Sequence, residues 1–160
     1  MIAGVSVGLF FILVGTIAVV NINHLSQLGD FANDLTAVNV TNTSIQLPAP
    51  NVPAAHTAVY TIAFQFALGL GLLEVLVLGM RLGLGSRIRR TTGTVGGIVF
   101  WFGAAYFLSG LANMKSTLAV SQQQELWFQF WAAIIILIGV SIIVRAVVYF
   151  TAKAVRRSQV

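Results

Sequence analysis

Two charged side chains interrupt long apolar stretches of this sequence. Glu74 lies in the stretch LGLLEVLVLGM, and Arg145 lies in IIILIGVSIIVRAVVYF. An ionised carboxylate or guanidinium is costly to hold alone in hydrocarbon, so such residues usually face one another inside a helix assembly. We therefore expect Glu74 and Arg145 to form an intramembrane ion pair. As an alternative, the same two groups would line a path for protons, ions or small solutes.

Two histidines are the next residues with metal-binding chemistry. His24 follows the first apolar stretch and His56 precedes the second, so they could approach each other as haem ligands or as ligands of copper or zinc. No carboxylate or third imidazole stands close to them in sequence. We therefore expect a solvated or hydrogen-bonding role for both and regard them as weak metal candidates. No cofactor is expected, with haem or quinone as the open alternative.

Other catalytic signatures are absent from the sequence. It contains no cysteine, which removes thiolate metal sites and cysteine nucleophiles. It also shows no nucleophile paired with a base, no phosphate-binding loop and no zinc protease motif. The sequence therefore predicts a protein that is not an enzyme.

The composition indicates an integral membrane protein. Hydrophobic residues make up 58% of the 160 residues and charged residues only 8%, with a mean hydropathy of +0.91. A helix needs ~20 residues to cross a bilayer, and four apolar blocks come close to or exceed that length. The sequence predicts one all-α transmembrane domain over residues 1–160, in which four helices form a bundle, with spans at about 2–20, 57–80, 95–112 and 126–150.

Basic residues predict the orientation of these spans. They concentrate in the loop 81–94 and in the tail 151–160, whereas the loop 21–56 and the connection after the third span together hold only Lys115. By the positive-inside rule, both termini are cytoplasmic and the loop 21–56 is external, as in a multi-pass protein of the cell (plasma) membrane. Nucleic acid is not an expected partner. The side chains expected to contact lipids of the inner leaflet are Arg81, Arg87, Arg89, Arg90, Lys153, Arg156 and Arg157.

The external loop of about 35 residues divides into two parts. Within HLSQLGDFANDLTAV, apolar residues recur at spacings of three and four, which predicts a short amphipathic helix. The following NVTNTSIQLPAPNVP is polar and rich in proline, so we expect it to be extended. Asn39 and Asn42 each begin a glycosylation sequon, which makes them possible modification sites on the external side.

Small residues indicate which helix faces pack closely. On the second span, small side chains recur every four residues and lead to Glu74, while glycines on the third span repeat every seven residues. Because helix association in lipid depends on close packing, these faces are expected to be contact surfaces. The predicted helix-packing residues are Ala63, Ala67, Gly71, Gly96, Gly103 and Gly110.

Aromatic residues are concentrated in the middle of the third span. Trp101, Phe102, Tyr106 and Phe107 lie there within seven positions. We interpret them as core or lipid contacts, with the wall of a pocket for a quinone or pigment as the alternative.

Three functional hypotheses follow from these features. The first is a non-catalytic accessory or structural subunit of a larger membrane complex or homo-oligomer, with the bilayer and other membrane subunits or copies of itself as partners. The alternative is a small homo-oligomeric channel or transporter that uses Glu74 and Arg145. The third is a haem- or quinone-associated subunit of an electron-transfer complex. A transport path would normally need more polar lining than one pair of charges, which favours the first hypothesis.

Overall fold

The computed structural model describes residues 2–40, 43–84 and 88–157, and the side chains of 4–40, 43–84 and 91–155. The described chain is mostly helical, with one small two-stranded sheet. Its elements are α1 (Ile2–Val20), η1 (Ile22–His24), α2 (Gln27–Asp34), β1 (Leu35–Asn39), β2 (Gln46–Pro50), η2 (Pro53–His56), α3 (Thr57–Gly83), α4 (Ile88–Ala112) and α5 (Val120–Arg157).

Several helices of the described chain are long and apolar enough to cross a membrane. Helices satisfy their backbone hydrogen bonds internally, which is the requirement for crossing lipid. By length and composition, α3, α4 and α5 can each cross a membrane. The fourth candidate is α1 together with the segment Ile22–Asp34, which is bent away from it by 71°. Three helices, or up to four if this bent pair is one span, therefore meet the requirement within the described residues.

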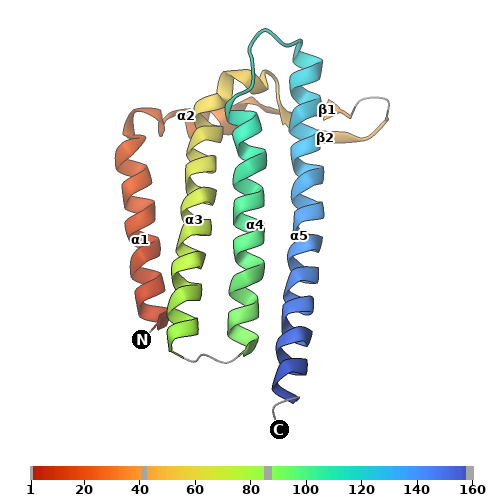
Figure 1. Cartoon of the computed structure of the whole chain (residues 1–160). Helices are drawn as coiled ribbons and strands as arrows, with labels where there is room; N and C mark the ends of the chain where they lie inside the picture. Colours follow the sequence, from red (N-terminus) through yellow and green to blue (C-terminus); the bar gives the residue numbers. More distant parts are fainter. Residues whose placement is uncertain (1, 41–42, 85–87, 158–160) are drawn as a thin grey trace.

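The four long helices stand in a row in the order α1, α3, α4, α5 (Figure 1). Among the described residues, the extensive helix contacts are those of α3 with α4, α4 with α5, and α1 with α3. The ion pair expected between Glu74 and Arg145 requires the second and fourth spans to meet. The extensive contacts of α3 and α5 are with α4, and α3 also meets α5 at the end where both helices begin, where the rings of Tyr60 and Trp127 lie 5.9 Å apart. Short connections make consecutive helices antiparallel neighbours, and they link α3 to α4 and α4 to α5.

The helices are longer than the predicted spans. The loop expected at 81–94 is mostly helical, because α3 continues to Gly83 and α4 already begins at Ile88. Likewise α5 begins at Val120 and continues to Arg157, through most of the predicted tail. Hydropathy marks the part of a helix that fits hydrocarbon, whereas Arg, Lys, Gln and Glu are good helix formers that extend it into the polar region.

Helix α1 is attached to the row through α3. Leu13 of α1 packs against the backbone of α3 at Gly69, where an added Cβ would collide with it. Phe10 meets Phe66 of α3 edge to face, with ring centroids 6.2 Å apart. At the end of α1, the buried Asn21 donates a hydrogen bond of 2.8 Å to the side chain of Gln65. These contacts hold α1 at one edge of the row.

The segment between α1 and α3 forms a cap over one end of the helices (Figure 1). We call this the cap end, and the opposite end, where both termini lie, the terminal end. The short helix expected in this loop is α2, but the chain becomes extended at Leu35, earlier than the apolar spacing predicts. The extended segment expected next includes β2, which pairs with β1 in an antiparallel hairpin.

The hairpin aligns Leu35 with Pro50 and Asn39 with Gln46. Both strands of a two-stranded sheet are edge strands, so the missing N–H groups of Pro48 and Pro50 are tolerated. The hairpin was not predicted, because the sequence NVTNTSIQLPAPNVP shows no clear alternation of apolar and polar residues.

Candidate functional site

The two charges expected to pair, Glu74 and Arg145, pack over neighbouring positions of α4, toward the terminal end (Figure 1). Glu74 of α3 packs over Gly97, where an added Cβ would lie 2.9 Å from the carboxylate Oε1. Arg145 of α5 packs over Gly96, where an added Cβ would lie 2.8 Å from the arginine Cδ. Two neighbouring glycines of α4 therefore make room for two opposite charges from different helices.

The structure does not join these charges directly. Within the described residues, Glu74 and Arg145 form no ion pair within 4.0 Å, and the extensive contacts of α3 and α5 are with α4. Their electrostatic attraction acts over a longer distance. The direct ion pair expected between Glu74 and Arg145 is therefore not present in the described residues. The functional role of the two charges stays a prediction.

Arg81 is a third charged residue near Glu74 and Arg145, and its interaction with Glu74 was not predicted from the sequence. It attracts Glu74 more strongly than Arg145 does. Its guanidinium also donates a hydrogen bond to the hydroxyl of Thr94 on α4, which is fully buried. The spacing of seven residues between Glu74 and Arg81 places both on one helix face, and this signal was available in the sequence.

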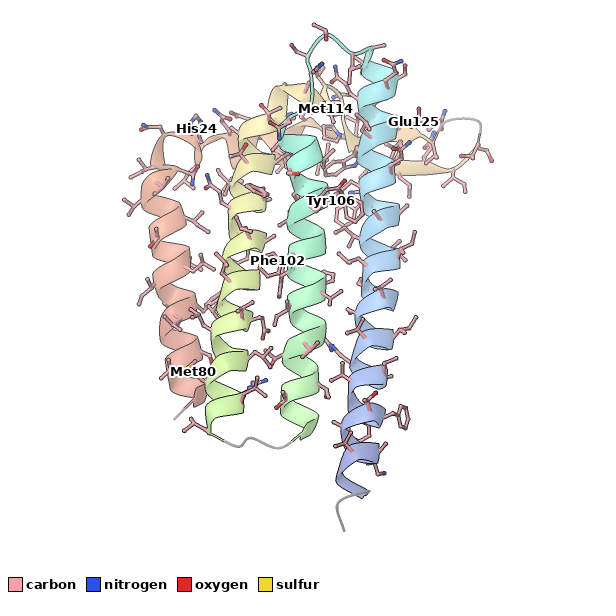
Figure 2. All side chains as sticks on the ribbon, viewed as in Figure 1. His24, Met80, Phe102, Tyr106, Met114 and Glu125 are labelled. Carbon is pink, nitrogen blue, oxygen red and sulfur yellow. The ribbon has the colours of Figure 1, made fainter. Side chains whose placement is uncertain are left out.

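Most of the predicted packing residues contact a neighbouring helix. Ala67 is buried in a core cluster with α4 and α5 residues, and Gly71 lies against the ring of Phe102, with an added Cβ 3.2 Å away (Figure 2). A Cβ added at Gly103 would lie 2.5 Å from Cδ1 of Leu137 on α5. In contrast, Ala63 is only half-buried, and nothing lies within 4 Å of a Cβ at Gly110.

The cap end contains an ion pair that the sequence did not predict. His56 Nε2 lies 2.8 Å from Asp34 Oδ2, although the two residues are distant in sequence. The same carboxylate accepts hydrogen bonds from the side chain of Asn51 and the backbone N–H of Val52. The hydrogen bond with His56 is the main reason that the pKa of Asp34 is lowered from its usual value of 3.8. This pair links the end of α2 to the start of α3.

The two histidines have separate partners. His24 lies at the cap end of α1, and its Nδ1 is 3.2 Å from the side-chain nitrogen of Gln27 (Figure 2). His56 is held by Asp34 and packs edge to face on Phe31. In the described parts of the chain, no group of three or more His, Cys, Asp or Glu could hold a metal ion.

Trp127 of α5 fastens the cap to the helices. Its indole nitrogen donates a hydrogen bond of 3.1 Å to the carbonyl of Pro48, and its ring contacts Phe31 and Tyr60. One turn earlier, Gln123 accepts a 2.9 Å hydrogen bond from the backbone N–H of Ala54. The cap is therefore held by defined hydrogen bonds as well as by aromatic packing.

Below the cap, an apolar cavity of about 380 Å³ lies between α3, α4 and α5. Of the four aromatic residues predicted as a possible pocket wall, Trp101 lines it. Phe102 packs on α3 instead, and Tyr106 is 72% exposed (Figure 2). The cavity is lined by Phe31, Val59, Tyr60, Ala63, Phe66, Ala67, Phe100, Trp101, Ala104, Leu108, Trp127, Phe130, Trp131 and Ile134.

The remaining predicted sites lie at the two ends. Asn39 is exposed at the end of β1, whereas Asn42 lies outside the described residues. Arg87 also lies outside them. Lys153 is exposed near the end of α5. For the other predicted lipid contacts on α4 and α5, the structure describes only the helical backbone: Arg89, Arg90, Arg156 and Arg157.

Comparisons with protein-family models, with curated proteins and with solved structures find no match for this chain. The class of protein rests on the helices themselves: the described chain is mostly helical, with three or up to four helices long and apolar enough to cross a membrane.

Proposed function

We propose that this protein is a non-catalytic structural or accessory subunit of a larger membrane complex or homo-oligomer. It would sit in the cell membrane as a four-span protein with the terminal end in the cytoplasm and the cap outside. The distribution of Lys and Arg supports this orientation, and the termini and the cap lie at opposite ends of the helix row (Figure 1).

The observation that carries the proposal is the open edge of the helix row at α1. The extensive contacts of α1 with another long helix are those with α3, and its side chains elsewhere are largely exposed. A helix row of this kind leaves an edge that a further membrane helix can join. The functional proposal is that such a helix, from a partner or a second copy, completes the row.

Three glycines give this edge a surface suited to helix packing. Successive residues of a helix are rotated by ~100°, so Gly4, Gly8 and Gly15 fall within about 40° of one another, and Leu13 faces the opposite way toward α3. A Cβ at any of the three glycines would meet no atom within 4 Å. Small residues spaced by four positions allow membrane helices to approach closely.

Transport is the second candidate, because Glu74 and Arg145 have no direct partner among the described residues. Other polar groups that a path would need are already engaged within the chain. Gln65 accepts a hydrogen bond from Asn21, and the hydroxyl of Ser141 donates to the carbonyl of Ile138. Lost flux with retained assembly in a Glu74→Gln variant would favour transport over the structural role.

The absence of native cysteine allows a direct test by cross-linking in native membranes. Phe11 is 67% exposed and lies on the glycine face of α1, so a Phe11→Cys variant is expected to cross-link to a partner or to a second copy. Val14, one turn away on another face, provides the Val14→Cys control, which should cross-link poorly. Adding Gly8→Leu to the Phe11→Cys variant should abolish the product. A solitary chain in every case would remove the basis of the proposal.

A further inference from the structure

Arg145 is a cation at membrane depth that the chain leaves without a close counter-charge. It is exposed on α5, and so are the apolar side chains around it, with exposed fractions of 57% for Ile142 and 63% for Ile143. In the described residues, no carboxylate lies within 4.0 Å of its guanidinium, and Glu74 attracts it from the neighbouring glycine of α4. A guanidinium in apolar surroundings requires an anion.

Two further polar groups follow Arg145 toward the terminal end. Tyr149 and Lys153 come four and eight residues later, so the three side chains descend one side of α5 over ~12 Å. Tyr149 is partly exposed and Lys153 is exposed. Arginine, a phenol and lysine at this spacing offer several hydrogen-bond donors near the membrane surface, a set that suits a phosphate group.

The same face of the helix row leads to the apolar cavity. Eighteen residues make five helical turns, so Trp127 and Arg145 share one side of α5, and Trp131 and Tyr149 share the adjacent side. Trp127 and Trp131 both line the cavity. The cation and the cavity therefore belong to one surface of α5, separated along its axis by roughly 21–27 Å. An acyl chain of one leaflet covers about half of the ~30 Å hydrocarbon core, so it extends part of the way from Arg145 toward the cavity.

Helices α3 and α4 repeat this arrangement. On α3, Ala67 lines the cavity, and Glu74 lies two turns further on the same face. On α4, Phe100 lines the cavity, and Gly93 lies two turns nearer the terminal end. A Cβ at Gly93 would meet no atom of the described residues within 4 Å, so α4 presents no bulky side chain at this position. All three helices thus connect the aromatic cavity to the charged level.

From these contacts we propose that this face binds an anionic phospholipid. Its phosphate is held by Arg145, with Tyr149 and Lys153 beside it, and one acyl chain runs between α3 and α5 toward the aromatic cavity. The negative headgroup matches the balance of charge at this level, where Arg81, Arg145 and Lys153 outnumber Glu74. The proposal concerns a lipid ligand and does not depend on the assembly described above.

The test is native mass spectrometry of the full chain, exchanged in detergent against defined lipids. We expect one phosphatidylglycerol to be retained, and phosphatidylcholine and phosphatidylethanolamine to be lost. Retention should fall roughly tenfold or more in an Arg145→Gln variant, since hydrogen bonds to a charged group are removed. Lys115 is exposed at the cap end, so the Lys115→Gln control should retain lipid like the original chain.

Two further variants separate position from charge. Arg145→Lys keeps the charge but loses the planar fork, and should bind at an intermediate level. Gly96→Ala keeps Arg145 but displaces its side chain, and should weaken retention if the guanidinium must lie against α4. These variants also serve if Arg145→Gln fails to fold.

The proposal is overturned by any of four results. Undiminished lipid retention in Arg145→Gln would show that this cation is not the ligand. Preference for phosphatidylethanolamine would assign the headgroup amine to Glu74 instead. Equal protection against thermal unfolding by inorganic phosphate and by phosphatidylglycerol would show that a free anion suffices. A change of oligomeric mass in Arg145→Gln without lipid loss would assign Arg145 to a protein partner.

Discussion

The two ends of the molecule treat their polar groups in opposite ways. At the cap end, Asp34, His56 and Asn51 bind one another, and Trp127 and Gln123 reach the backbone of the cap. The hydroxyl of Tyr60 differs, because it is buried and has no hydrogen-bond partner within the described ranges of the chain. Toward the terminal end, Glu74 and Arg145 lie on neighbouring glycines of α4 without a direct partner among the described residues.

This difference indicates different roles for the two regions. A satisfied polar network fixes one arrangement of the chain and gives little reason for an outside ligand. Charges without a direct partner at membrane depth have an uncompensated free energy of desolvation, which a ligand or a partner of opposite charge can offset. We therefore interpret the cap as architecture, and the charged level together with the α1 edge as the surfaces on which the protein acts.

The largest expected loss of stability comes from replacing Trp127, which anchors the cap to the helices. A Trp127→Ala variant loses buried ring packing and the hydrogen bond to Pro48, and should lower the free energy of unfolding by about 3–5 kcal/mol. Trp131 provides the matched control, because its side chain is 48% exposed and Trp131→Ala should cost only about 1 kcal/mol. Circular dichroism during unfolding in mild detergent measures both. Equal losses would mean that the cap is not anchored through Trp127.

A glycine pair on α4 tests the packing between the two ends. Gly103→Ala places a methyl group against Leu137 and should destabilise the protein by about 1–3 kcal/mol. Gly110→Ala meets no atom and should be neutral or stabilise by up to about 1 kcal/mol through helix propensity. The same unfolding measurement applies. Similar values for the two variants would contradict the close contact of α4 with α5.

The cap-end ion pair gives a smaller, pH-dependent effect. The folded pKa of Asp34 is lowered, so its contribution to stability is present above about pH 4, the unfolded value, and disappears as the pH falls through the folded pKa. The loss should stay below about 1 kcal/mol, because Asp34 is partly exposed to solvent. Unfolding midpoints compared between pH 7 and pH 3 should show it, and an Asp34→Asn variant should remove that component.

The smallest expected effect concerns Glu74 and Arg145 together. Since the two side chains form no ion pair within 4.0 Å in the described part of the chain, a double-mutant cycle with Glu74→Gln and Arg145→Gln should give a coupling energy below about 0.5 kcal/mol. Unfolding of the two single variants and the double variant supplies the numbers. A coupling of about 2 kcal/mol or more would restore the direct ion pair that the sequence predicts.

The sequence predicts the helices well and their neighbours poorly. Continuous apolar runs specify α1 and the core of α3, α4 and α5, because crossing or packing in lipid leaves few alternatives to a helix. The order of helices in space is not contained in hydropathy. The charges at Glu74 and Arg145 predict a direct contact between their helices, but the short connections on both sides of α4 make α4 the main neighbour of both.

The sequence predicts the candidate functional site only in part, because local patterns describe single helices and not contacts between them. Periodicity along a single helix identifies the residues that share a face, so the sequence predicts Gly96 and Gly103 as packing positions. The spacing of seven residues between Glu74 and Arg81 could likewise have predicted that these two charges interact. Contacts between distant segments carry no such signal. The pairing of His56 with Asp34 and the aromatic cavity depend on how the cap folds back over α3 and α5, which local patterns do not specify.

The most direct measurement is the native mass of the gently solubilised protein. The polar groups of the cap end bind one another within the chain, whereas we propose that the edge at α1 and the charged level are completed from outside. We therefore expect a mass above that of the 17.1 kDa chain, from bound subunits and a retained anionic phospholipid. A stable, solitary chain of 17.1 kDa without lipid would contradict this proposal.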